Sequence, residues 1–94
     1  MKYRSRSDIV SLILDAGNGG GATKTKLTYK AYLSFNRLKD YLADLLENGL
    51  LVYEEKKRAY KTTEKGLRLL QLKNRMDEIA PINYSSIKNS WDYH

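Results

Sequence analysis

Apolar residues are most regularly spaced after Ser34, where they recur every three or four positions and predict an amphipathic helix over residues 35–48. Ser34 can cap the start of this helix, because its hydroxyl can accept a hydrogen bond from a backbone amide of the first turn. Gly49 can end it, because glycine adopts the left-handed backbone conformation without a steric penalty. The apolar face consists of Leu38, Tyr41, Leu42, Leu45 and Leu46. The opposite face is polar and available for contact.

Two short apolar segments follow this helix, residues 50–54 and 59–62, and a charged turn separates them. Their composition predicts a β-hairpin. No Asn-Gly or Gly-Gly pair marks a tight turn, so we expect a loop of several residues. Thr63 can cap a last helix, with Glu64 in the first turn, where the helix dipole favours an acidic residue. Pro81 predicts that this helix ends near residue 80.

The first third of the chain predicts two further helices. Ser5 and Asp8 have the spacing of a capping box and precede an apolar stripe that reaches Ala16. The glycine-rich segment 17–21 then ends the helix, and we expect it to be a flexible interhelical loop. A short helix is predicted over residues 24–30. The fold class is therefore mainly α with a small β-hairpin, in the helix, helix, helix, hairpin, helix order of a winged helix-turn-helix.

A chain of 94 residues fits one structural domain with a modest core. We assign residues 1–66 to the winged helix-turn-helix, residues 67–80 to a C-terminal dimerisation helix and residues 81–94 to a tail. The apolar residues of the tail have helical spacing, whereas its Ser and Asn content is typical of disorder. The sequence leaves both possibilities open for the tail.

Charge narrows the class of partner. Lys and Arg number 17 against 11 Asp and Glu, which gives a formal net charge of +6 and an isoelectric point of about 9.6. A polyanion is the natural partner of such a chain. Cysteine is absent, which fits a reducing compartment, and no apolar run approaches the length that spans a membrane. We therefore expect a soluble, cytoplasmic protein with no membrane partner.

Three segments resemble the family of small, basic, ten-kilodalton archaeal winged-helix DNA-binding proteins. They are residues 29–35, 42–50 and 60–66, and the resemblance extends over about residues 5 to 80. The Tyr-Lys-Ala-Tyr-Leu-Ser-Phe run that begins at Tyr29 is the most particular match, because the other two segments occur in many winged helices. The resemblance implies binding of double-stranded DNA, as a transcription regulator or a chromatin-type architectural protein, and a nucleoid-associated location. It also implies a homodimer that pairs through an antiparallel coiled coil.

The resemblance further implies that the helix over residues 35–48 enters the major groove with its N-terminal end leading. Asn36 and Arg37 would then contact base edges, because an amide can pair with adenine and a guanidinium group with guanine. Residues expected to contact the DNA backbone are Lys24, Lys26, Lys30, Ser34 and Lys39. Residues expected to form a basic wing at the hairpin tip are Lys56, Lys57 and Arg58.

The last helix carries a second apolar pattern. Leu69, Leu72, Met76 and Ile79 recur at spacings of three, four and three, which is a coiled-coil seam of two heptads. Leu67 and Leu70 point to another side and are expected to pack on the winged-helix body. We therefore expect a homodimer through the seam; the alternative is a monomer in which the helix has one wide core face. A seam of two heptads is only marginally stable alone.

Other activities have little support in the residues. The segment 17–25 superficially resembles a phosphate-binding loop, but it lacks the glycine directly before the lysine and follows a helix instead of a strand. The only histidine is His94, so we expect no enzyme activity, no cofactor, no metal and no small-molecule substrate. The leading alternative is a winged-helix protein-interaction module, supported by acidic residues on the polar face of the 35–48 helix, where Asp40 would repel phosphate. These residues are Asp40, Asp44 and Glu47. RNA binding is the third possibility.

Overall fold

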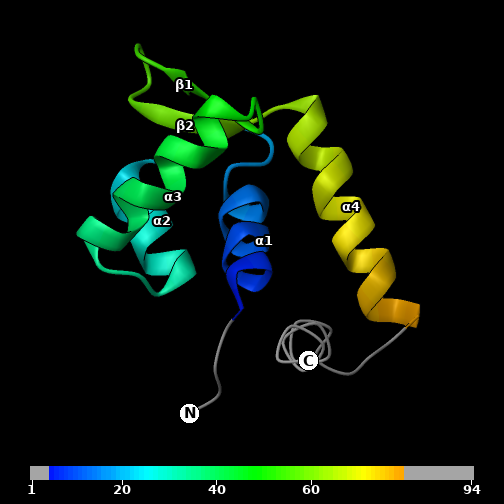
Figure 1. The fold of residues 1–94 in the computed structure, drawn as a ribbon. Helices are drawn as coiled ribbons and strands as arrows, with labels where there is room; N and C mark the ends of the chain where they lie inside the picture. The colour runs from blue at the N-terminus through cyan, green and yellow to red at the C-terminus, as the bar shows by residue number, and fades with distance from the viewer. Residues whose placement is uncertain (1–4, 80–94) are drawn as a thin grey trace.

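A computed structural model describes residues 5–79, which form four helices and a two-stranded antiparallel hairpin (Figure 1). The elements are α1 (Arg6–Ala16), α2 (Lys24–Ala31), α3 (Phe35–Glu47), β1 (Leu51–Glu54), β2 (Ala59–Thr62) and α4 (Glu64–Ile79). The order and class predicted from the sequence are confirmed, and the helix boundaries agree within one residue. The predictions for the end of α4 near residue 80 and for the tail lie outside the described residues.

Each helix begins at a hydroxyl side chain that the sequence marks as a cap. The side-chain oxygens of Ser5, Thr23, Ser34 and Thr63 each accept a hydrogen bond from the backbone amide three residues ahead, at 3.1, 3.2, 3.2 and 3.0 Å. At Ser5 the capping box is complete, because the Asp8 carboxylate accepts a hydrogen bond from the Ser5 amide at 3.2 Å. Four local side-chain signals therefore set where the helices start.

The core lies around α1, which packs against α2 on one side and α4 on the other (Figure 1). The largest fully buried side chains come from four different elements: Ile13, Leu14, Leu27, Leu38 and Leu51. They are contributed by α1, α2, α3 and β1, so one apolar cluster joins the three helices to the hairpin. Burial of large aliphatic side chains is the main stabilising term for a domain of this size.

The hairpin pairs Leu51 with Thr62 and Tyr53 with Tyr60, and the segment before α2 adds a third, short pairing. The Ala22 amide donates to the Tyr60 carbonyl at 2.8 Å, and the Tyr60 amide donates to the Ala22 carbonyl at 2.7 Å. The Thr62 amide donates to the Gly17 carbonyl at 2.9 Å. The expectation of a flexible loop after α1 is wrong at both ends of the glycine-rich segment, because backbone pairing with β2 fixes them.

The start of α4 is fixed to the end of α3. Gly49 has φ +71° and ends α3 as predicted, and its carbonyl accepts a hydrogen bond from the Thr63 hydroxyl at 2.7 Å. The Lys65 ammonium donates to the Asn48 carbonyl at 2.8 Å. The carbonyls of the two residues that follow α3 thus accept hydrogen bonds from residues at the start of α4. This junction determines the direction in which α4 leaves the body of the protein.

Candidate nucleic-acid interface

Helices α2 and α3 form a helix-turn-helix, and residues 32–34 connect them. Tyr32 adopts the left-handed conformation, with φ 54° and ψ 45°, and its amide donates to the Thr28 carbonyl. The next amide, that of Leu33, donates to the same carbonyl at 3.1 Å. Ser34 then caps α3 through its bond to the Arg37 amide. The turn therefore holds the first residues of α3 at the surface, beside the end of α2.

The basic residues predicted for DNA contact lie on this helix-turn-helix. Between Asp15 and Asp40 the sequence contains no acidic residue, and all five basic residues in that interval are exposed. They are Lys24, Lys26, Lys30, Arg37 and Lys39. Asn36 is exposed as well, and Ser34 retains a hydroxyl proton that can be donated to an acceptor. One continuous stretch of chain thus presents five positive charges without a competing negative one.

One contact shows how α2 and α3 are brought together. The Lys24 ammonium lies 5.1 Å from the centre of the Phe35 ring, a cation–π distance. Lys24 is the first residue of α2 and Phe35 is the first residue of α3. The basic start of α2 is therefore adjacent to the end of α3 that is expected to lead into a groove. The Phe35 ring remains about half exposed at 51%.

The acidic residues of α3 lie further along the helix, and one of them has a positive neighbour. The Asp44 carboxylate is 3.6 Å from the Arg6 guanidinium of α1, which also lies 5.1 Å from the centre of the Tyr41 ring. Both charged side chains are mostly exposed, so the pair contributes little to stability. It does offset the negative charge of Asp44. Asp40 remains exposed on the same helix as Arg37 and is the residue that least fits a phosphate-facing surface.

The hairpin forms the predicted wing. Its turn consists of residues 55–58, as expected for a loop of several residues, and Arg58 closes it with φ 49°. The Arg58 amide donates to the Glu55 carbonyl at 3.1 Å. The three basic wing residues, Lys56, Lys57 and Arg58, are all exposed. Figure 1 shows the hairpin at one end of the molecule, beyond the C-terminal end of α3.

The apolar seam of α4 faces solvent in this chain. Leu69, Leu72 and Ile79 are 38%, 55% and 84% exposed, and Met76 is partly buried. Leu70, on another side of the helix, is buried at 8% as predicted. Within residues 64–79 the seam therefore does not form part of a single wide core face, which was the alternative to a dimer.

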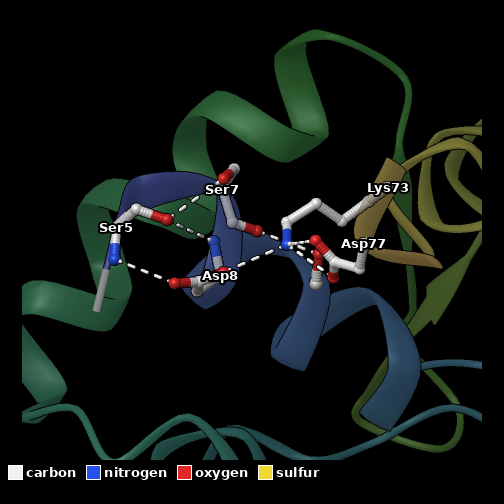
Figure 2. A network of polar contacts seen from close by, with 6 residues as sticks. Ser5, Ser7, Asp8, Lys73 and Asp77 are labelled. Carbon is white, nitrogen blue, oxygen red and sulfur yellow. Dashed lines mark hydrogen bonds and ion pairs between the residues drawn. The ribbon is translucent and has the colours of Figure 1, made fainter. Parts of the chain in front are cut away.

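A charged network attaches α4 to the start of α1 (Figure 2). The Lys73 ammonium lies 3.1 Å from the Asp8 carboxylate and 2.9 Å from that of Asp77, and only 15% of its side chain is exposed. Asp8 is also the capping-box residue whose carboxylate accepts a hydrogen bond from the Ser5 amide. The same carboxylate thus caps α1 and binds a lysine from the third turn of α4.

Burial and pairing act in opposite directions on these groups. Burial alone would raise the pKa of Asp8, but hydrogen bonds from Lys73 and Ser5 outweigh it and lower that pKa below its usual value. Burial alone would lower the pKa of Lys73, but hydrogen bonds to Asp77 and Asp8 outweigh it and raise that pKa. Both shifts favour the charged forms, so Asp8 and Lys73 are ionised at neutral pH.

Two features of the surface were not predicted from the sequence. Tyr29 and Tyr32 are 80% and 79% exposed at the end of α2, although aromatic residues usually bury much of their surface. The available signal was their position outside the buried stripe of α2, which consists of Leu27 and Ala31. The Lys73 network was also missed, because Lys73 and Asp8 are 65 positions apart and no local pattern connects them.

No helix within residues 5–79 is long and apolar enough to cross a membrane. The same residues contain no group of three or more His, Asp or Glu side chains placed to hold a metal ion.

Three helices, a tight α2–α3 turn and a basic hairpin define a winged helix-turn-helix. The sequence matches the winged helix-turn-helix family over residues 3–81, and the chain belongs to this family. Its fold is similar to that of Sso10a-2, a DNA-binding protein from Sulfolobus solfataricus, with a TM-score of 0.72 and 96% of each chain covered. The two sequences are 22% identical. No curated protein matches the sequence significantly. The resemblance to small archaeal winged-helix proteins is thereby confirmed.

Proposed function

We propose that this protein binds double-stranded DNA, with α3 in the major groove and α2 and the wing on the phosphate backbone. The observation that carries the proposal is the exposed, acid-free basic stretch between Asp15 and Asp40, displayed on the helix-turn-helix. Phosphate neutralisation by lysine and arginine supplies most of the affinity of such surfaces. The DNA-binding description of Sso10a-2, which shares the fold, supports the same function.

The roles of individual residues follow from their places on the elements. Asn36 and Arg37, in the first turn of α3, are proposed to contact base edges. Residues proposed to contact phosphate from α2, the α3 cap and α3 are Lys24, Lys26, Lys30, Ser34 and Lys39. The wing residues are proposed to contact an adjacent groove or its phosphates. With only two side chains assigned to base edges, we expect modest sequence selectivity and a large electrostatic component.

We further propose that residues 67–80 act as a dimerisation helix and that the protein works as a homodimer on DNA. The exposed seam of α4 provides the apolar surface, and a second copy of the same helix would cover it. Such a dimer could act as a transcription regulator or as an architectural protein of the nucleoid. A regulator should bind its operator far more tightly than random DNA, whereas an architectural protein should bind any duplex with steep salt dependence.

The proposal is tested by measuring the affinity of the full chain for a random-sequence duplex at several salt concentrations. We expect Arg37→Ala/Lys39→Ala to weaken binding and to lower the slope of log K against log salt by about 1 unit, because Lys39 is the proposed phosphate contact of the pair and Arg37 the proposed base contact. The matched control is Arg68→Ala/Arg75→Ala, which removes the same charge from exposed positions of α4. The control should change the slope much less.

Absence of duplex binding at low salt would refute the proposal and leave the protein-interaction function, with Asp40, Asp44 and Glu47 as its acidic contact residues. Equal effects of the two double variants would show that net charge matters and that the α3 surface does not. A Lys56→Ala/Lys57→Ala/Arg58→Ala variant with an unchanged slope would remove the wing from the interface. Tighter binding to double-stranded RNA than to DNA would favour the third possibility.

A further inference from the structure

We propose that Tyr29 and Tyr32 form an uncharged part of the DNA interface, in which their hydroxyls donate hydrogen bonds to backbone phosphates beside the groove that α3 enters. This inference rests on the proposed function and extends it to two residues that charge alone does not indicate. Phosphate oxygens accept hydrogen bonds from tyrosine, and such contacts fix the position and orientation of a protein on the duplex.

The first observation is exposure. Tyr29 and Tyr32 are the most exposed aromatic residues within residues 5–79, at 80% and 79%. The side chains that attach α2 to the core are those of Leu27 and Ala31, both fully buried. The two tyrosines therefore add little to the packing of the chain, while they present large apolar rings to water. A pair of exposed aromatic side chains near the helix-turn-helix is a candidate interaction surface.

The second observation is the backbone of Tyr32. Its φ of 54° lies in the left-handed region, which residues other than glycine, asparagine and aspartate rarely adopt. Glycine is the usual residue at a helix end with this conformation. The backbone of this residue takes part in the turn, because its amide donates to the Thr28 carbonyl. A tyrosine here is therefore explained by what its side chain contacts, because the backbone conformation would be easier for glycine.

The third observation selects the partner. Tyr29 is adjacent to Lys30 in α2, and Tyr32 lies two residues before the Ser34 cap of α3. The surrounding stretch, residues 16–39, contains basic residues and no acidic one. An aromatic surface in this setting is complementary to a polyanion that offers hydrogen-bond acceptors and apolar sugar rings. A phosphodiester backbone offers both, whereas a protein partner would have to be strongly acidic.

The position of the tyrosines favours duplex DNA over a single strand. Tyr29 lies in the last turn of α2 and Tyr32 in the turn that leads to α3, whose N-terminal end is proposed to enter the major groove. The bases of a duplex are stacked on one another, which leaves phosphates and sugars as the groups within reach at the edge of the groove. Stacking of the tyrosine rings on unpaired bases is the competing interaction, and it depends on the ring and not on the hydroxyl.

The experiment removes only the hydroxyls. The full-length Tyr29→Phe/Tyr32→Phe variant is titrated with the same random-sequence duplex and salt series as the wild type. We expect binding about tenfold weaker, because two hydrogen bonds to charged acceptors are lost, with an unchanged salt slope. The slope is unchanged because a neutral hydroxyl releases no counterion. The matched comparison is Lys24→Ala/Lys30→Ala from the same helix, which should reduce both the affinity and the slope.

A second variant separates binding from folding. Tyr32→Gly relieves the positive φ and removes the side chain, so we expect weaker duplex binding, and the melting temperature is recorded to show that the variant remains folded. Wild-type affinity in either the Phe or the Gly variant overturns the inference while leaving the proposed function intact. Loss of oligo(dT) binding in either variant, with unchanged duplex binding, would also overturn the inference and would favour stacking of the tyrosine rings on unpaired bases. A wild-type protein that does not bind duplex DNA refutes both.

Discussion

Among individual residues, Gly66 marks the closest approach of α4 to the body of the protein. A Cβ atom at this position would collide with the Leu50 carbonyl oxygen and would lie 2.7 Å from Cγ2 of Thr62. The carbonyl belongs to the backbone and cannot rotate away. The glycine in the Thr-Glu-Lys-Gly segment is therefore required by the contact between α4 and Leu50, which lies between α3 and β1, because only a residue without a side chain fits there.

We predict that Gly66→Ala lowers the free energy of unfolding by about 2 kcal/mol, because the cost of overpacking exceeds the gain in helix propensity. Urea or thermal unfolding followed by circular dichroism measures this change. Gly20→Ala is the matched control, because a Cβ at Gly20 would meet nothing within 4 Å, and it should stay within about 0.5 kcal/mol of the wild type. Equal stability of the two variants would contradict the close approach of α4.

Among the elements, α4 is held to α1 by the Lys73 network, and its contribution depends on pH. The folded-state pKa of Asp8 lies below its ordinary value of 3.8. The stabilisation is therefore fully present above about pH 3.8 and is lost as the pH falls through the folded-state pKa. The pKa of Lys73 is raised above 10.5, so its contribution is present below that pH and is lost as the pH rises further.

We predict that Lys73→Met reduces the loss of melting temperature between pH 7 and about pH 3 relative to the wild type. Without the ammonium, the pKa of Asp8 is no longer lowered by Lys73, so protonation of Asp8 destabilises the fold less than it does in the wild type. Melting temperatures across the acid range provide the measurement. Lys61→Met, at an exposed position of β2, is the control and should follow the wild-type profile. A Lys73→Met profile parallel to the wild type would exclude the network as a source of acid sensitivity.

The elements also show what could be predicted from the sequence. Helix starts were predictable because Ser5, Thr23, Ser34 and Thr63 signal them through bonds only three residues long. The end of α3 was predictable from Gly49 for the same reason of locality. The pairing of Ala22 with Tyr60 was not, because a single bridge between residues 38 positions apart leaves no periodic pattern.

The candidate site likewise has features that could be predicted from the sequence and features that could not. The exposure of the basic residues on α2, α3 and the wing follows from helix and hairpin periodicity, so it could be predicted. The environment of each charged side chain could not be predicted, because it depends on tertiary packing. Arg6 beside Asp44, Lys24 over Phe35 and Lys73 between two carboxylates all join different elements or different turns. The exposure of Tyr32 depends on a left-handed turn that its sequence does not favour.

In the whole molecule, two surfaces of different chemistry are held in a fixed relation. The basic helix-turn-helix and wing belong to one part of the chain, and the apolar seam belongs to α4, on the other side of α1 (Figure 1). The junction at Gly66 and the Lys73 network fix α4 at its start and in its third turn. A dimer formed through the seam would therefore hold two DNA-binding surfaces at a defined separation.

We predict that Leu72→Glu converts a homodimer into a monomer, because a buried carboxylate at the centre of the seam has no partner charge. Light scattering at micromolar concentration measures the mass of each form. The fold should be retained, since Leu72 is 55% exposed in the single chain. Val52→Glu is the control, because Val52 is similarly exposed at 46% but lies in β1, and it should remain dimeric. A wild-type protein with the mass of a monomer would refute the dimer.

The same variant tests whether the two surfaces act together on one duplex. Linked domains bind with an effective concentration far above that of free monomers, and phosphate contacts from both contribute to the salt slope. We therefore expect the Leu72→Glu monomer to bind a random-sequence duplex more weakly than the wild type, with roughly half its salt slope. An unchanged slope in Leu72→Glu would mean that each winged helix contacts DNA independently, and the seam would then serve to join separate duplexes.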